Sequence, residues 1–78
     1  MVTAHHLDGI AMFVEFDAVR LLIDVPELGL KRGMVGTVLM IHTGPSLAYE
    51  VEFMEAEGDT FAVQPNDIES ASATHLQA

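Results

Sequence analysis

Apolar and polar residues alternate along much of this chain, which is the pattern of strands with one buried face. The clearest case is the run AYEVEFM, where Tyr49, Val51 and Phe53 share one face and Glu50 and Glu52 share the other. Successive side chains of a strand point to opposite sides. We therefore expect a half-buried strand here, with its glutamates facing outward.

The earlier run AVRLLID alternates in the same way and places Val19, Leu21 and Ile23 on one face. A helix is the alternative, because some apolar residues of this region also recur at helical spacing. Pro26 would cut such a helix short, so we favour the strand. A further short strand over residues 10–15 is an open alternative within an otherwise irregular beginning.

The run VGTVLMIH at residues 35–42 is apolar on both faces, which predicts a strand that is central or bent between two packing surfaces. Gly33 and Gly36 flank its start and indicate a tight turn and a strand bend where a Cβ would clash. In the preceding loop, Leu28 and Leu30 are expected to pack back over the core.

Turn signals separate the remaining segments. The run TGPS predicts a turn, and EAEGD predicts a hairpin connection with Gly58 at a positive φ. The run TFAVQ alternates again, PND predicts one turn of 3₁₀ helix, and residues 68–69 predict a short last strand. Small polar residues without an apolar anchor follow.

Five short strands in so few residues predict an all-β fold, a small antiparallel barrel or roll in which closure protects the strand edges. The expected organisation is a flexible leader over residues 1–12, a barrel over 13–70 and a flexible tail over 71–78.

Charge narrows the choice of partners. The 78 residues contain 12 acids and only three Lys or Arg, which gives a net charge of −9. A nucleic acid would be repelled by this charge. No apolar run reaches the roughly 20 residues that span a bilayer, and residues 1–8 lack the features of a signal peptide. Together with the absence of cysteine, this predicts a cytoplasmic protein that binds neither membrane nor nucleic acid.

The main candidate site is a cluster of five carboxylates within ten residues. Its members are Glu50, Glu52, Glu55, Glu57 and Asp59. Three uses are open: a solvated face that keeps the protein soluble, a surface for a basic protein, and a catalytic pair that would need a desolvated carboxyl group. We treat the cluster as a hypothetical partner-binding surface. Within it, Glu52 is expected to pair with Arg20 or Lys31.

Other chemistry finds little support. His5 and His6 lie near Asp8 but lack the spacing of a metal site, and we interpret them as solvated side chains. The serines have no patterned His and Asp to activate them. We therefore expect no catalytic residue, no bound metal and no cofactor. Met34, Met40 and Met54 are expected mainly to fill the core, and Met40 or Met54 would instead add to a plastic contact surface if it faced outward.

The run from Asp17 to Glu69 resembles a family of small bacterial proteins known as Domain of Unknown Function 4926. The matching positions are Asp17, Val19, Leu21, Pro26, Gly29, Leu30, Gly33, Gly36, Thr37, Val38, Tyr49, Val51, Glu52, Phe53 and Gly58. The same motifs also resemble the SH3-like barrel of nitrile hydratase β subunits and, more faintly, ribosomal KOW motifs. The resemblance implies an SH3-like barrel and carries over no catalytic residue.

The resemblance also shapes the expected function. Small proteins of this kind are often encoded beside other small genes, including suspected toxins, and by analogy we expect a non-enzymatic protein-interaction module with an antitoxin or immunity role. An accessory subunit of a larger enzyme is the alternative, and a KOW-like nucleic-acid module ranks lower because basic side chains are scarce. Whether the chain acts as a monomer or a homodimer is left open.

Overall fold

The computed structural model describes residues 6–7 and 10–71, and its regular elements are β-strands and short 3₁₀ helices. The strands are β1 (His6–Leu7), β2 (Ile10–Ala11), β3 (Ala18–Leu21), β4 (Val35–His42), β5 (Ala48–Phe53), β6 (Phe61–Val63) and β7 (Ile68–Ser70). Three short 3₁₀ helices join them, namely η1 (Pro26–Leu28), η2 (Met54–Ala56) and η3 (Pro65–Asp67). In the described ranges, no helix has the length and apolar character needed to cross a membrane.

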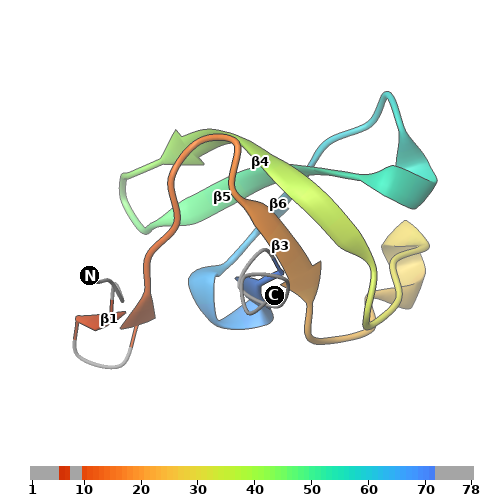
Figure 1. Cartoon of the computed structure of the whole chain (residues 1–78), viewed down its shortest axis with the longest axis horizontal. Helices are drawn as coiled ribbons and strands as arrows, with labels where there is room; N and C mark the ends of the chain where they lie inside the picture. Colours follow the sequence, from red (N-terminus) through yellow and green to blue (C-terminus); the bar gives the residue numbers. More distant parts are fainter. Residues whose placement is uncertain (1–5, 8–9, 72–78) are drawn as a thin grey trace, which may run out of the picture.

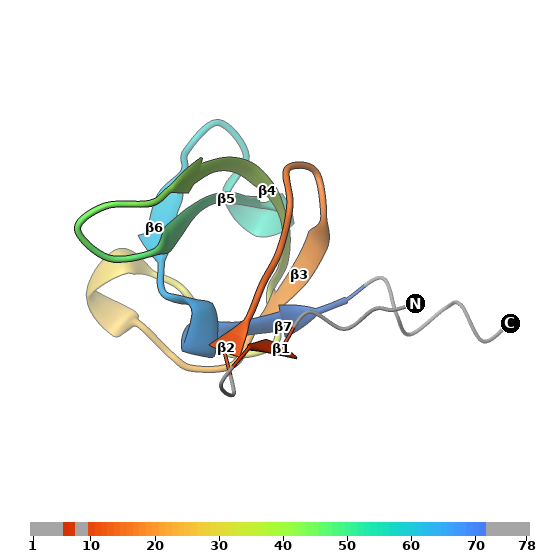
Figure 2. The same ribbon diagram turned by 90° about the vertical axis from the view of Figure 1, so that its left-hand side faces the viewer.

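Five strands form one antiparallel sheet in the order β6-β5-β4-β3-β7, and Figure 1 shows its central strands β5, β4 and β3. β1 and β2 pair separately. Strand β4 is central, as its two apolar faces predicted. In Figure 2 the five strands surround a common interior, with β4 and β5 on one side and β7 on the opposite side. The predicted all-β fold of about five antiparallel strands is confirmed.

A bend near the start of β4 closes the sheet tightly. Gly36 lies opposite Phe53, and a Cβ added to it would lie 2.6 Å from the Glu52 carbonyl oxygen and 2.7 Å from Val51 Cγ1. Only glycine leaves enough space at such an approach. A register shift between Val38 and Met40 marks a bulge a little further along. The predicted close backbone approach at Gly36 is therefore confirmed.

The core lies inside the curved sheet and is entirely apolar apart from one phenol. Its buried members are Phe13, Val19, Leu21, Leu30, Val38, Tyr49, Val51, Phe53, Val63 and Ile68. The alternation predicted for β5 is confirmed, because every second residue from Tyr49 to Phe53 is buried.

Two predictions about apolar residues were wrong. Leu28 does not cover the core and is about half exposed, because η1 and the left-handed Gly29 turn the chain so that Leu30 points inward instead. The bridge between Val25 and Leu30 closes this loop. Ile23 is also exposed, since β3 ends at Leu21 and no longer imposes the alternation.

The segment before β3 forms an arch, which we define as residues 12–17 and which rises from β2 and descends into β3 (Figure 1). Phe13 anchors the arch. Its ring meets the Tyr49 ring edge-on at 5.3 Å, and its backbone N–H donates to the Tyr49 hydroxyl at 3.0 Å. The arch contains no helix, so the strand interpretation of residues 18–21 was correct and the helix alternative fails.

The predictions for the two ends of the chain stay predictions. Residues 1–5, 8–9 and 72–78 lie outside the described part of the chain. Within the expected leader, β1 pairs with β2, and the expected strand over residues 10–15 is limited to the two residues of β2. Just before the expected tail, the Ala71 N–H donates to the Ala18 carbonyl at 2.9 Å.

Candidate functional site

The five predicted carboxylates fall into two groups. Glu50 and Glu52 point outward from β5 and are partly buried, whereas the other three lie on the connection between β5 and β6 and are exposed. We call the exposed group, Glu55, Glu57 and Asp59, the acidic turn. Glu50 lies in the middle of β5, Glu52 lies near its end, and the acidic turn follows that end, so the two groups have different surroundings.

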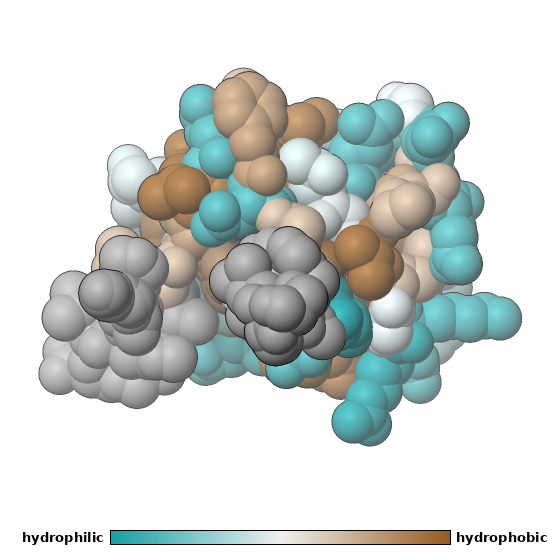
Figure 3. All heavy atoms as spheres, in the orientation of Figure 1, coloured by the Kyte–Doolittle hydropathy of each residue, from teal (hydrophilic) through white to brown (hydrophobic). Residues whose placement is uncertain are grey.

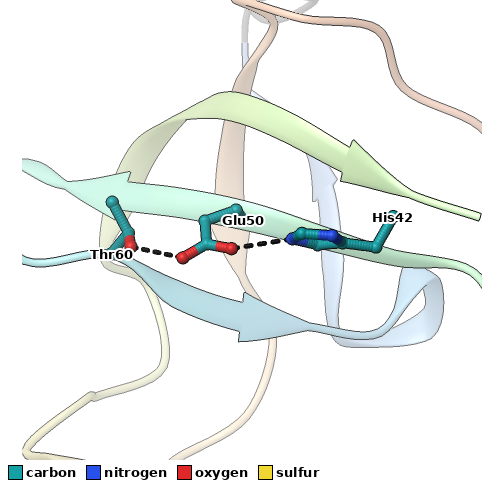
Figure 4. Close-up of polar contacts among 3 residues, drawn as sticks. All are labelled: His42, Glu50 and Thr60. Carbon is teal, nitrogen blue, oxygen red and sulfur yellow. Dashed lines mark hydrogen bonds and ion pairs between the residues drawn. The ribbon is translucent and has the colours of Figure 1, made fainter.

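Glu50 lies at the centre of a small polar network on the outer face of the sheet, shown in Figure 4. One of its oxygens accepts a hydrogen bond from the Thr60 hydroxyl, and the other lies 2.8 Å from His42 Nε2. Because an ionised carboxylate only accepts, that nitrogen must carry the hydrogen. The network joins β4, β5 and the residue just before β6.

These contacts favour the charged form of Glu50. The hydrogen bond from Thr60, followed by the hydrogen bond from His42, lowers the pKa of Glu50 below its usual value of 4.5, against the opposing effect of desolvation. A general acid at neutral pH needs the opposite shift. The arrangement therefore acts as a structural clamp and lacks the electrostatics of a catalytic acid.

Glu52 does not form the predicted pair with Arg20 or Lys31. Its carboxylate accepts the Gly58 backbone N–H at 2.9 Å, so it holds the connection to β6 in place. Arg20 pairs with Glu69 instead, at 2.9 Å, because the register of β3 and β7 sets these two residues directly opposite each other. The prediction was wrong because it ignored this long-range register.

The acidic turn is the exposed part of the cluster. It begins at η2, and the Asp59 N–H donates to the Ala56 carbonyl at 3.2 Å, which closes the turn. In the part of the chain that the structure describes, neither recorded ion pair includes Glu55, Glu57 or Asp59. Their charges are therefore available to a partner.

Next to the acidic turn lies a shallow hollow of about 160 Å³. It is lined by Thr37, Glu52, Phe53, Met54 and Glu57. Met54 exposes 67% of its surface and Met40 exposes 51%, so the expectation that these two methionines fill the core was wrong. A flexible thioether beside two carboxylates suits a contact that combines apolar packing with charge attraction.

A second hollow of about 260 Å³ lies between the β4–β5 connection and η3. Its walls are Ser46, Leu47, Gln64, Pro65 and Asn66. None of these side chains is ionisable, so the hollow offers neutral hydrogen-bonding groups and some apolar surface.

Metal-binding chemistry was also considered. Between residues 12 and 71, where side chains are described, no three His, Cys, Asp or Glu side chains gather in a way that could hold a metal ion. The prediction for His5 and Asp8 falls outside the described residues, and only the backbone of His6 is described, in β1.

Sequence reasoning missed His42 and Thr60 as partners of Glu50. The contact between His42 and Glu50 could have been predicted from the pairing of β4 with β5. His42 and Ala48 pair at the end of β4 and β5, so residues 42 and 50 are diagonal neighbours on one face. Thr60 could not be found in this way, because it precedes β6 and its position depends on the path of the turn.

Comparison with known proteins gives one match. No curated protein and no solved structure matches the chain. Residues 15–66, which are most of the chain, match the family described as Domain of unknown function (DUF4926). The match spans β3 to η3 and therefore includes the acidic turn and the clamp around Glu50. The resemblance to this one family is confirmed, and the chain belongs to the DUF4926 family.

Proposed function

We propose that this chain is a non-enzymatic protein-interaction module that binds a basic partner protein through the acidic turn. The observation that carries the proposal is the exposure of Glu55, Glu57 and Asp59 beside an exposed Met54. The neighbouring glutamates, in contrast, are engaged within the sheet. The net charge of −9 would accelerate the encounter with a cationic surface and repel nucleic acid.

The proposed partner is the product of a neighbouring gene in the bacterial cytoplasm, and the proposed role is that of an antitoxin or immunity protein. The absence of cysteine fits such a reducing environment. We also propose that the chain is an SH3-like barrel. The support is the sheet order, in which β3, the first strand of the five-stranded sheet, pairs with both β4 and the last strand, β7.

A second candidate function is that of an accessory subunit in a larger enzyme. Exposed large apolar side chains favour it, because a permanent interface would bury them. They include Met12, Val14, Phe16, Met40 and Met54. A subunit would co-purify with its enzyme at every salt concentration, whereas a partner recruited mainly by charge would be released as salt rises.

The test compares two variants with the same change in charge. Glu55→Gln with Glu57→Gln neutralises the acidic turn, and Asp24→Asn with Glu27→Gln neutralises two exposed carboxylates away from both the acidic turn and residues 12–17. Each tagged protein is incubated at low salt with lysate of the native host, and the retained proteins are quantified. We expect at least one basic protein to be retained by the wild type and the control and lost by the turn variant.

With that protein purified, its association rate should fall with rising salt for the wild type and the control and vary less for the turn variant. Identical sets of retained proteins for all three would refute the proposal and leave solubility as the role of the acidic turn.

A further inference from the structure

The arch exposes apolar side chains although its backbone is well fixed. Phe13 is buried, while Met12, Val14 and Phe16 point outward, and Phe16 exposes 73% of its surface. This is the largest exposed fraction among the large apolar side chains in the described ranges. Figure 3 shows brown, apolar residues gathered around the top of the arch, interrupted by teal, polar ones.

Several contacts fix the arch in this form. The Asp17 carboxylate accepts the Val14 N–H at 2.9 Å, and the Phe16 N–H donates to the Val38 carbonyl at 2.6 Å. Phe13 holds the other limb in the core through Tyr49. Because the backbone is already ordered, a partner that contacts the arch meets little cost of ordering it.

The conformation of Phe16 is unusual for its side chain. Its φ is 72°, and no other non-glycine residue in the described part of the chain has a positive φ. Glycine or asparagine would adopt this conformation with less strain, and a polar residue would be more soluble. An exposed aromatic ring in a strained backbone is a feature of binding sites, where such rings contribute much of the affinity.

Strand β4, to which the arch is bonded, carries a further exposed apolar side chain. The bond from Phe16 joins the arch to β4 at Val38, and two residues further Met40 faces outward with 51% of its surface exposed. Met40 stands directly opposite Glu50, and Glu15 is exposed within the arch. An adaptable apolar centre thus has carboxylates beside it.

We propose that the arch surface, which consists of Met12, Val14, Phe16 and Met40, docks an apolar side chain from a basic, amphipathic segment of a partner protein. The inference rests on the proposed function and adds to it an apolar anchor separate from the acidic turn. Charge selects this occupant. A second copy of the chain would bring another net charge of −9 against the exposed Glu15, whereas lysines beside an apolar residue would complement it.

The probe is a synthetic amphipathic helix peptide of leucine and lysine with one tryptophan. The chain has no tryptophan, so tryptophan fluorescence reports on the peptide alone. A second peptide replaces every leucine by glutamine and keeps the charge. We expect the leucine peptide to bind the full chain and the glutamine peptide to bind about tenfold more weakly or less.

The decisive variant is Phe16→Asn, since asparagine tolerates the left-handed conformation and we therefore expect the fold to be retained. Leu28→Asn is the matched control, because it removes an exposed leucine from η1. Phe16→Asn should weaken binding of the leucine peptide about tenfold, and Leu28→Asn should leave it unchanged. Equal binding by wild type and Phe16→Asn would overturn the proposal, as would failure of the leucine peptide to bind at all.

Two further measurements separate this inference from the function on which it rests. If both peptides bind equally and Glu55→Gln with Glu57→Gln abolishes binding, the acidic turn acts alone and the arch proposal fails. If only Phe16→Asn reduces binding, the arch proposal holds and the acidic turn is not the contact. Sedimentation of the free chain tests the other occupant: dimerisation that Phe16→Asn abolishes would overturn the proposal in favour of a second copy.

Discussion

The arch and the connection from β5 to β6, which carries the acidic turn, both project side chains from one sheet, and each contains a residue in the left-handed region. In the connection to β6 this residue is Gly58, with φ 93°, and in the arch it is Phe16, with φ 72°. Each N–H is held by the sheet, the first by Glu52 and the second by the Val38 carbonyl. The two positions have similar backbone requirements, but one is occupied by glycine, which has no side chain, and the other by a large aromatic residue.

The difference shows what each segment presents. The acidic turn presents charge from neighbouring positions, so its left-handed position can be occupied by the residue that fits best. The arch places a phenylalanine where glycine would fit, which costs backbone strain and solubility. This contrast is why we attribute binding at the arch to the side chain of Phe16 itself.

Among the substitutions considered, Gly36→Val should destabilise the fold most, because glycine is required at this position for space. A Cβ would meet the Glu52 carbonyl and Val51 well inside contact distance. We expect the free energy of unfolding to fall by about 3 kcal/mol. Urea denaturation followed by circular dichroism measures this, and an unchanged midpoint would show that the sheet can open at Gly36.

Gly58→Val tests the backbone requirement alone, since no atom lies within 4 Å of the position that its Cβ would take. A β-branched residue at this φ should lower the free energy of unfolding by about 2 kcal/mol. Gly58→Asn is the control and should cost less, because asparagine tolerates the conformation. Equal costs for the two variants in urea denaturation would mean that conformation is not what selects glycine.

Unlike the two glycine substitutions, Phe16→Asn should not lower the free energy of unfolding. It therefore tests the comparison between Phe16 and Gly58 most directly. Relief of the strain at φ 72° should leave the free energy of unfolding unchanged or raise it by up to about 1 kcal/mol. The same urea denaturation measures this. A clear loss of stability would show that the ring of Phe16 supports the fold, and the contrast with Gly58 would then lose its meaning.

The smallest expected effect concerns pH and the clamp around Glu50. Because the pKa of Glu50 is lowered in the folded state, by Thr60 first and His42 second, its carboxylate stabilises the fold above the ordinary value of 4.5. This stability is lost as the pH falls below that value. Thermal unfolding between neutral and acid pH should therefore show a weaker pH dependence in Glu50→Gln.

Thr60→Val provides the control for the clamp, because it removes the largest cause of the shift. It should weaken the pH dependence in the wild type and have no further effect on it in Glu50→Gln. Additive effects of the two substitutions would contradict a direct link between Thr60 and Glu50.

Local patterns were enough to predict most of the sheet. The alternation in β5, the central position of β4, the positive φ of Gly58 and the 3₁₀ turn at Pro65–Asp67 all depend on a few neighbouring residues. Each of these features could be predicted from the sequence because the local sequence and the fold favour the same conformation.

Features set by distant contacts could not be predicted in this way. The pairing of Arg20 with Glu69 depends on the register of β3 and β7, which alternation does not specify. The form of the arch depends on Phe13 reaching Tyr49, 36 residues away. For the candidate site, the sequence identified all five carboxylates but not the division between those bound to the sheet and those exposed.

The position of β7 has a consequence for how the chain folds. Strands β4, β5 and β6 follow one another and can pair through short connections, whereas β7 must return to β3, so that Glu69 meets Arg20 across 49 residues. Contacts between distant residues form late, because the entropy of closing the long loop is lost before any contact compensates it. We therefore expect β7 to dock last. Until it does, β3 exposes an unpaired edge to any neighbouring chain, so the risk of aggregation is concentrated in the final step of folding.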